Sequence, residues 1–264
     1  MSYSVSSVVS IAGSDSSGGA GIQADIKTIA AFGLFAQTVV TALTAQNTTG
    51  VFAVADSAPT FVRAQIDAVF TDIRPDAVKI GMVSSSAIAD AVADGLAAHS
   101  ARNIVLDPVM VSTSGAALID ERAQNALIEK LFPLASVITP NIPETEVLCG
   151  MEVRTKDDMQ RAACMLKAKT PGAVLVKGGH GVSGADDVLC CDEGVFWFEG
   201  HRIDTQDTHG TGCTLSSAIA CGLAEGRSVP DAVDAAKRYV AGALEAGFRM
   251  GKGSGPLDHM WRYR

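Results

Sequence analysis

The chain has 264 residues, of which 47% are hydrophobic, and it carries a formal net charge of −8. This length and composition predict a single domain that spans residues 1–264. The mixed charges contain no basic block, so we expect no nucleic-acid partner. No apolar run approaches the roughly 18 residues of a membrane helix, and the six cysteines form no C-x-x-C pair. We therefore expect a cytoplasmic protein with reduced thiols and no membrane association.

Short β-branched runs alternate with segments of helical periodicity over the first two thirds of the chain. The predicted strands lie at residues 5–13, 38–43, 76–82, 103–110, 136–141 and 173–179. The predicted helices lie at residues 21–33, 59–73, 84–99, 120–132 and 156–169. Strands that alternate with helices predict an α/β fold, with a mostly parallel central sheet covered by helices on both faces.

The pattern of elements changes after Gly179. The further predicted elements are strands at 186–191 and 195–200 and helices at about 212–225 and 230–248. Because only three residues separate the two strands, they are expected to form a hairpin. We expect the residues from about Gly251 onward to form a loose tail.

Polar and glycine residues stand at the ends of the predicted strands. They occur at residues 13–21, 44–47, Met82, Asp107, 139–144 and 177–180. In an open α/β sheet, ligands bind at the carboxyl ends of the strands. We therefore expect these segments to meet at one edge of the sheet and to form a ligand site there.

The first of these loops contains 19-GAGIQA-24, which fits the G-x-G-x-x-A pattern of dinucleotide-binding proteins. That pattern also requires an acidic residue at the end of the second strand, and the second strand here ends in 43-LTAQN-47. No G-x-x-x-x-G-K-[ST] loop occurs in the chain. An NAD-dependent oxidoreductase is therefore a minor alternative, and we interpret the loop as flexible backbone that closes over a small ligand.

Asp107, Asn141 and Glu144 follow two successive predicted strands and could approach a hard cation at the same edge. Mg²⁺ usually takes one or two carboxylates together with waters and substrate phosphates, so a few side chains suffice. The alternative is that Asn141 and Glu144 only cap a helix opened by Pro143. The residues leave both interpretations open.

Lys177 and two histidines lie in the later loops. Lys177 ends a predicted strand and could bring a positive charge to a phosphate group, or it could simply lie in solvent. His180 and His209 have no metal-ligand spacing to another His or Cys, which disfavours a zinc site. We expect each histidine to lie at the surface or to make ordinary hydrogen bonds.

The stretch 208-THGTGCT-214 comes directly before a helix of small residues. The first N–H groups of a helix have no partner within the helix, and glycines let an anion approach them closely. The stretch therefore predicts an anion site built from backbone. Cys213 falls in the first turn, where the pKa of a thiol is lowered and an accessible thiolate is expected, whereas Cys221 fits a packed helix interior.

Together, these motifs closely resemble the hydroxymethylpyrimidine/phosphomethylpyrimidine kinases of thiamin biosynthesis. The motifs that carry the resemblance are 11-IAGSDSSGGAGIQADIKT-28, 40-VTALTAQNTTGV-51, 79-KIGM-82, 106-LDPVM-110, 138-ITPNIPE-144, 176-VKGGH-180 and 208-THGTGCT-214. The resemblance runs from about Val8 to about Gly247 with the motifs in order. That family belongs to the ribokinase-like superfamily, and pyridoxal kinases are near relatives.

The resemblance implies a three-layer α/β/α sandwich that uses ATP and Mg²⁺. The implied reaction phosphorylates the hydroxymethyl group of 4-amino-5-hydroxymethyl-2-methylpyrimidine and then phosphorylates the monophosphate again. The family also suggests a homodimer. Pyridoxal kinase is the alternative within the same chemistry, and a non-catalytic metabolite-binding protein is the alternative from another class.

The resemblance also assigns roles to single residues. The residues implied to line the pyrimidine pocket are Gly13, Ala20, Thr44, Gln46 and Met82. Gln46 is the expected specificity contact, because its amide offers donors and an acceptor to the ring edge. Family members often carry Val where Thr44 stands, which matters little if the backbone makes the contact.

The remaining implied roles concern phosphate and metal. Asp107, Asn141 and Glu144 would organise Mg²⁺, and Lys177 and Thr208 would contact the nucleotide. The residues implied to form the anion hole are Gly210, Thr211, Gly212 and Cys213. Sugar kinases of the superfamily end this motif in Asp, so Cys213 is expected to act as the base that takes the hydroxyl proton.

Overall fold

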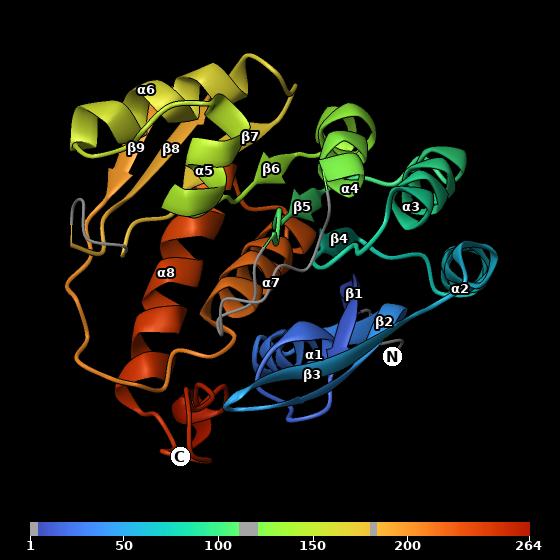
Figure 1. The fold of residues 1–264 in the computed structure, drawn as a ribbon, viewed down its shortest axis with the longest axis horizontal. Coiled ribbons are helices and arrows are strands. Elements are labelled where there is room, and N and C mark those ends of the chain that lie inside the picture. Colours follow the sequence, from blue (N-terminus) through green and yellow to red (C-terminus); the bar gives the residue numbers. More distant parts are fainter. Residues whose placement is uncertain (1–4, 111–120, 180–183) are drawn as a thin grey trace.

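The computed structural model describes residues 5–110, 121–179 and 184–264, whose fold Figure 1 shows. Its centre is a nine-stranded sheet with the order β3-β2-β1-β4-β5-β6-β7-β8-β9. The strands are β1 (Ser7–Asp15), β2 (Phe35–Asn47), β3 (Gly50–Asp56), β4 (Ala77–Ile80), β5 (Ile104–Leu106), β6 (Val137–Ile138), β7 (Ala173–Val176), β8 (Asp187–Cys191) and β9 (Gly194–Phe198). The predicted α/β fold is confirmed.

The middle of the sheet is parallel and both of its edges are antiparallel. The pairs β1–β2, β1–β4, β4–β5, β5–β6 and β6–β7 run parallel. The predicted hairpin is the antiparallel pair of β8 and β9 at one edge. At the other edge, β3 pairs antiparallel with β2 and was missed in the sequence.

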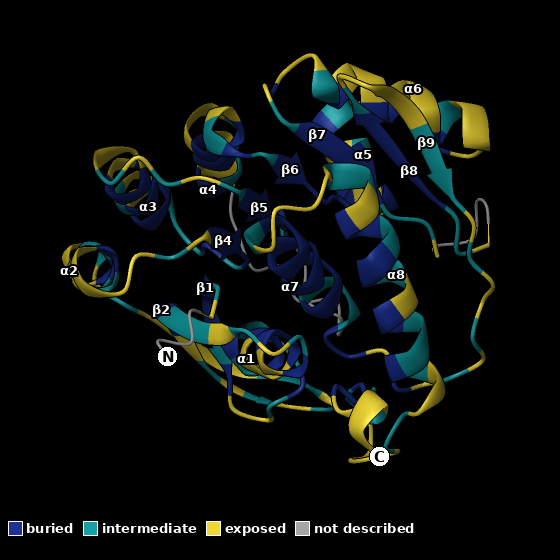
Figure 2. Ribbon diagram, turned by 180° about the vertical axis from the view of Figure 1, so that it is seen from behind, coloured by how far each residue is buried: buried dark blue, intermediate teal, exposed yellow. Residues whose placement is uncertain are grey.

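Helices cover both faces of the sheet. Their bounds are α1 (Gly21–Ala31), α2 (Pro59–Asp72), α3 (Ser86–Ala98), α4 (Glu121–Ala126), α5 (Ile142–Cys149), α6 (Lys156–Lys167), α7 (Thr211–Ala224) and α8 (Val229–Glu245). One core cluster packs α2, α3, α4 and α6 against the sheet, and a second packs α1, α7 and α8 against its other face. Figure 2 shows the buried sides of these helices turned toward the strands. This arrangement is the three-layer sandwich that was predicted.

α7 is the most deeply buried helix in the layer formed by α1, α7 and α8. Ten of its residues are buried, from Thr214 to Leu223. Small residues allow α8 to approach it closely, because a Cβ atom on Gly222 would lie 2.7 Å from Ala232 Cβ. The small-residue pattern that stood out in the sequence therefore reflects helix packing.

The helix predicted at residues 120–132 ends differently from the expectation. After α4, the chain continues as a π-helical turn (Leu127–Leu131) and a 3-10 turn (Phe132–Leu134). Pro133 lies inside the last turn and cannot donate a backbone N–H, which is consistent with a helix ending there.

The C-terminal residues do not form a loose tail, and that prediction is wrong. Ser254 N–H donates to Thr48 O at 3.1 Å. Leu257 is fully buried, and Tyr239 Oη donates to His259 O at 2.7 Å. The segment therefore packs against both α8 and the loop after β2. No helix in the described ranges has the length and apolarity needed to cross a membrane.

Candidate active site

Polar residues gather at the carboxyl ends of the parallel strands, as the sequence predicted. Asp15 is the last residue of β1, Asp107 directly follows β5, and Lys177 directly follows β7. β2 and β4 lie on opposite sides of β1, so the strand order reverses there. Such a switch point opens a crevice at the strand ends, which is the usual ligand site of an open α/β sheet.

Two predicted substrate-binding residues, Gly13 and Met82, lie against each other at this switch point. A Cβ atom on Gly13 would lie 2.6 Å from Met82 Cε, so a larger residue at position 13 would displace the methionine. Thr41 Oγ1 donates to Met82 O at 2.7 Å, which ties the residue after β4 to β2.

Thr44 and Gln46 lie on the end of β2, beside the loop that follows β1. Thr44 Oγ1 donates to Ser14 O at 2.9 Å and also lies 3.1 Å from Gln46 Oε1. Ser16 Oγ donates to Gln46 O at 2.8 Å. These contacts fix both residues next to Gly13 and its neighbours in β1.

Ala20 precedes α1 and lies against the glycine motif before α7. Gly210 has φ of +89°, and a Cβ atom on it would overlap Gly19 O and lie 3.3 Å from Ala20 Cα. Only glycine therefore fits at position 210. The five predicted pocket residues and the predicted anion site thus lie at the same edge of the sheet.

Asp15 and His209 connect these two parts, although Asp15 was assigned no role of its own in the sequence analysis. His209 Nε2 lies 2.8 Å from Asp15 Oδ2 and 3.2 Å from the Gln46 amide. His209 is buried, and a Cβ atom on Gly19 would strike its ring. The hydrogen-bonding alternative for His209 is confirmed, while His180 lies outside the described residues.

The start of α7 presents free backbone donors. Thr211 N–H donates to Thr208 O, and Thr214 N–H donates to Gly210 O. Within the described chain, this leaves Gly212 and Cys213 N–H without a backbone acceptor. Thr208 itself is exposed, and its hydroxyl lies 3.1 Å from Ser254 Oγ. The geometry is that of an anion site at a helix N-terminus.

Lys177 is not in solvent but pairs with Asp107, beside the start of α7. Lys177 Nζ lies 2.8 Å from Asp107 Oδ1, and the two side chains are 12% and 3% exposed. A Cβ atom on Gly212 would lie 3.4 Å from both Asp107 Oδ2 and Lys177 Nζ. The absence of a side chain at position 212 therefore keeps the helix start close to this ion pair.

Asn141 and Glu144 form a capping box at the start of α5. Asn141 Oδ1 accepts from Glu144 N–H at 2.9 Å, and Glu144 Oε2 accepts from Asn141 N–H at 2.8 Å. The capping alternative is therefore confirmed. Burial raises the pKa of the Glu144 carboxyl to about 7, with Lys177 lowering it and Asp107 raising it. The raised pKa of Glu144, which is buried near a second carboxylate, indicates that the positive charge around the two groups does not balance them.

The donor set at this edge fits a hard cation. Asp107 and Glu144 are buried oxygen donors on neighbouring elements, and Mg²⁺ needs only one or two carboxylates when substrate phosphates complete its shell. In the parts of the chain that the structure describes, no three His, Cys, Asp or Glu side chains form a complete metal cage. The site therefore fits a cation that arrives with a phosphate ligand.

Cys213 lies in the first turn of α7, but the expected low pKa is wrong. Burial raises the pKa of the Cys213 thiol to about 11; Lys79 opposes this rise, and the nearby carboxylates of Asp25 and Asp107 add to it. Gly21 N–H points toward the sulfur and also favours the thiolate. These favourable contacts are too weak to offset desolvation, so the sulfur is a thiol at neutral pH.

A buried ion pair between β4 and α1 lies close to Cys213. Lys79 Nζ on β4 lies 2.8 Å from Asp25 Oδ2 on α1, and both side chains are fully buried. Ser10 Oγ and Ser217 Oγ also donate to Asp25. This pair was not predicted, because no local pattern around Lys79 or Asp25 indicates that the two residues are in contact.

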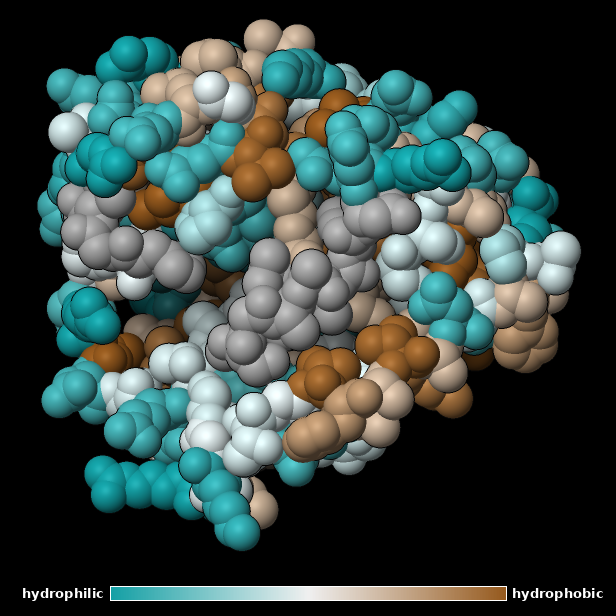
Figure 3. Space-filling view, viewed as in Figure 1, coloured by the Kyte–Doolittle hydropathy of each residue, from teal (hydrophilic) through white to brown (hydrophobic). Residues whose placement is uncertain are grey.

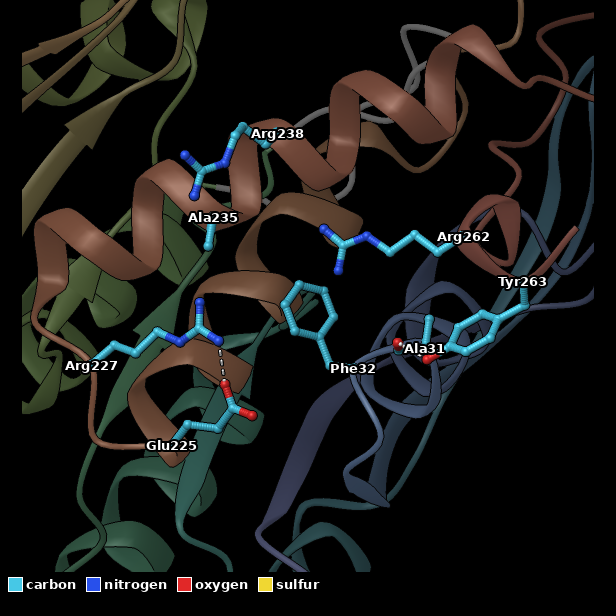
Figure 4. A pocket seen from close by; sticks show the side chains of 8 residues that line it. All are labelled: Ala31, Phe32, Glu225, Arg227, Ala235, Arg238, Arg262 and Tyr263. Carbon is cyan, nitrogen blue, oxygen red and sulfur yellow. Dashed lines mark hydrogen bonds and ion pairs between the residues drawn. The ribbon is translucent and has the colours of Figure 1, made fainter.

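A hollow of about 290 Å³ lies at the opposite end of α7 (Figure 4). Its basic residues are already engaged: Arg227 pairs with Glu225 at 2.9 Å, and Arg238 pairs with Asp234 at 2.6 Å. The Arg262 guanidinium lies over the Phe32 ring, among other rings. None of the predicted site residues lines this hollow.

Comparison with known proteins gives consistent matches along the chain. A family model described as phosphomethylpyrimidine kinase matches residues 15–258. A Streptomyces coelicolor protein named hydroxymethylpyrimidine/phosphomethylpyrimidine kinase is 48% identical over 254 residues, which are 96% of this chain and 94% of that protein.

Two solved structures are also similar. A phosphomethylpyrimidine kinase from Clostridium difficile 630 matches with 45% identity and a TM-score of 0.81, covering 89% of this chain and 98% of that one. A Bacillus subtilis pyridoxal kinase in complex with ADP matches with 36% identity and a TM-score of 0.90, covering 98% and 99%.

Proposed function

Because the chain belongs to the phosphomethylpyrimidine kinase family, we propose that it transfers the γ-phosphoryl group of ATP to 4-amino-5-hydroxymethyl-2-methylpyrimidine. A second transfer to the resulting monophosphate gives the diphosphate used in thiamin biosynthesis. One contact carries this proposal: His209, inside the glycine motif, lies 3.2 Å from Gln46, the residue assigned to the ring. A residue that binds the ring and an anion site at that distance from it suit a substrate whose hydroxyl group is phosphorylated while its ring is bound to Gln46.

Each predicted residue has a place in this reaction. The residues assigned to the pyrimidine are Gly13, Ala20, Thr44, Gln46 and Met82. The transferred phosphoryl group lies at the start of α7, where the Gly212 and Cys213 N–H groups stabilise its charge and Gly210 and Thr211 shape the turn. Lys177 and Thr208 contact the nucleotide.

Mg²⁺ is the cation that Asp107, Glu144 and the Asn141 cap would hold through waters and ATP phosphates. When bound, it neutralises charge on the transferred group. Lys177 holds the Asp107 carboxylate in place, since the two form a buried pair at 2.8 Å.

The test is a mass-resolved kinase assay with the pyrimidine, its monophosphate and pyridoxal as separate acceptors. We expect ATP-dependent products that are heavier by one phosphoryl group from the first two acceptors, and their loss in excess chelator. Full turnover in the presence of chelator would contradict the metal assignment. Binding of the pyrimidine without any ADP release would instead favour the non-catalytic metabolite-binding protein.

Pyridoxal phosphorylation is the second candidate function. It is favoured by the similarity to the Bacillus subtilis pyridoxal kinase, which extends over 98% of this chain. The same assay decides between the two, because a higher kcat/KM with pyridoxal than with the pyrimidine would reverse the assignment.

We further propose a cytoplasmic, single-domain chain that forms a homodimer. The continuous sheet supports a single unit, whose thermal unfolding should be one transition. Exposed apolar side chains on β2, β3 and α2 support a dimer interface: Leu43, Phe52, Val54 and Phe61. Figure 3 shows hydrophobic atoms gathered near the β2–β3 edge. A monomer mass in light scattering would contradict the dimer.

A further inference from the structure

The side-chain amide of Gln46 lies between two partners that restrict its orientation. Gln46 Nε2 is placed 3.2 Å from His209 Nε2, and Gln46 Oε1 is placed 3.1 Å from Thr44 Oγ1. The oxygen and nitrogen of an amide are nearly equal in shape, so the hydrogen bonds around the group decide which end is which.

Asp15 determines which end of the Gln46 amide faces His209. Ser17 N–H and Ser17 Oγ donate to Asp15 Oδ1, and Gly19 and Ala20 N–H donate to Asp15 Oδ2. Burial alone would raise the pKa of Asp15, but the hydrogen bonds from His209, Ser17 and Ala20 outweigh it and hold the pKa well below its usual value. Both oxygens of Asp15 are therefore acceptors.

Because Asp15 only accepts, His209 Nε2 must carry the proton that lies in their 2.8 Å contact. A ring nitrogen that carries a proton cannot accept from an amide N–H. Protonating Asp15 instead would not help, because the single lone pair of Nε2 cannot accept from two donors. The end of the Gln46 amide that faces His209 is therefore the oxygen.

The Thr44 side of the amide leads independently to the same orientation. Thr44 Oγ1 has one proton, and Ser14 O, which can only accept, lies 2.9 Å away. Once Thr44 donates to Ser14 O, its hydroxyl oxygen faces Gln46 as an acceptor. The end of the amide that faces Thr44 is therefore the NH₂ group.

We propose that Asp15 and His209 are positioning residues that hold the Gln46 amide with its oxygen toward His209 and its NH₂ group toward Thr44. The consequence for substrate selection rests on the proposed function. An aminopyrimidine edge presents a ring nitrogen acceptor beside an amino donor, and a fixed amide matches that pair in one register only. The ring nitrogen then lies on the Thr44 side and the amino group on the His209 side.

The first test is a double-mutant cycle on kcat/KM for the aminopyrimidine. His209→Leu should lower this value about tenfold or more, mainly through the KM of the pyrimidine, with the KM of ATP little changed. His209→Gln keeps an N–H donor and should restore most of the loss. In the Gln46→Ala background, His209→Leu should have less than about a twofold effect, because no amide remains to be oriented.

His201→Leu is the matched control, since His201 is exposed and pairs only with Glu245 at 3.4 Å among the described residues. Effects of His209→Leu and Gln46→Ala that multiply would overturn the proposal, as would an equal rise in the KM of ATP. The double-mutant cycle compares each variant with the turnover of the wild-type protein. A wild-type protein that does not phosphorylate the pyrimidine would therefore contradict the proposed function and not the amide orientation.

The second test uses the unaltered protein and does not depend on any variant folding. Long-range proton–nitrogen spectra should show a proton on His209 Nε2, and nuclear Overhauser effects should connect the Gln46 amide protons to Thr44. A His209 Nε2 without a proton, or amide protons that contact the His209 ring instead of Thr44, would overturn the orientation.

Discussion

Cys213 is the residue whose chemistry differs most from the expectation. A thiol with a pKa raised to about 11 is protonated at neutral pH, and its thiolate fraction rises about tenfold per pH unit up to that value. If this thiolate takes the hydroxyl proton, kcat should rise about tenfold per unit between pH 7 and pH 9. The measurement is kcat at saturating ATP and pyrimidine across that range.

Cys213→Asp is the control, because a carboxylate is ionised throughout this range and should flatten the profile. Cys213→Ala should bind nucleotide almost as before, since the Gly212 and Cys213 N–H groups belong to the backbone. A flat wild-type profile, or wild-type turnover in Cys213→Ala, would show that the motif acts through its backbone alone.

Glu144 caps α5 and is proposed to organise Mg²⁺, and one pair of variants can separate the two roles. Glu144→Gln can keep the capping box, because Gln at this position also accepts from the N-cap N–H. It should therefore melt near the wild-type temperature but transfer phosphoryl groups at least about tenfold more slowly, having lost the metal-organising charge. Glu144→Ala should also lose about 1 kcal/mol of unfolding free energy.

Thermal melting and initial rates check the two variants together. If Glu144→Gln retains full turnover with Mg²⁺, the capping box is the whole role of the residue. If both variants lose the same stability, the glutamine does not replace the cap.

At the scale of elements, the buried pair of Lys79 and Asp25 joins β4 to α1. Ser217 on α7 and Ser10 on β1 also donate to Asp25, so four elements meet at one carboxylate. Replacing one partner leaves the other charge buried and unpaired. Lys79→Met should therefore lower the unfolding free energy by about 3–5 kcal/mol in urea titrations.

Two further variants calibrate that loss. Ser217→Ala removes one hydrogen bond and should cost about 1 kcal/mol. Lys79→Met combined with Asp25→Leu removes both charges and should recover part of the single-variant loss. A Lys79→Met protein as stable as wild type would show that the ion pair does not stabilise the fold.

Local patterns predicted most of the elements because each is encoded within its own segment. The helix at 59–73 has apolar residues at helical spacing and is observed as α2, and the runs at 103–110 and 136–141 contain β5 and β6. β3 was missed because its run 51-VFAVA-55 shows no alternation of apolar and polar residues, and most of it is exposed at the sheet edge. Its place depends on pairing with β2.

The site was predictable where motifs end strands and unpredictable where distant residues meet. Asp107 and Lys177 were placed at the edge of the sheet from the strands that precede them, but their pairing was not foreseen. The contact between Asp15 and His209 joins residues 194 positions apart. No local pattern signals such a contact, and the pKa of Cys213 likewise depends on burial that several elements create.

At the scale of the whole molecule, the C-terminal segment supports the turn before α7, where we propose that phosphate binds. His209 N–H donates to Gly255 O at 3.0 Å, and Thr214 Oγ1 lies 3.0 Å from His259 Nε2. Deleting residues 251–264 removes these contacts and the burial of Leu257, and should lower the unfolding free energy by at least about 2–5 kcal/mol. The KM of ATP should rise as well, because the turn before α7 loses its support.

Lys252→Ala is the control, since its side chain is exposed. A deletion variant with wild-type melting temperature and wild-type KM for ATP would show that the glycine motif holds its shape without the segment.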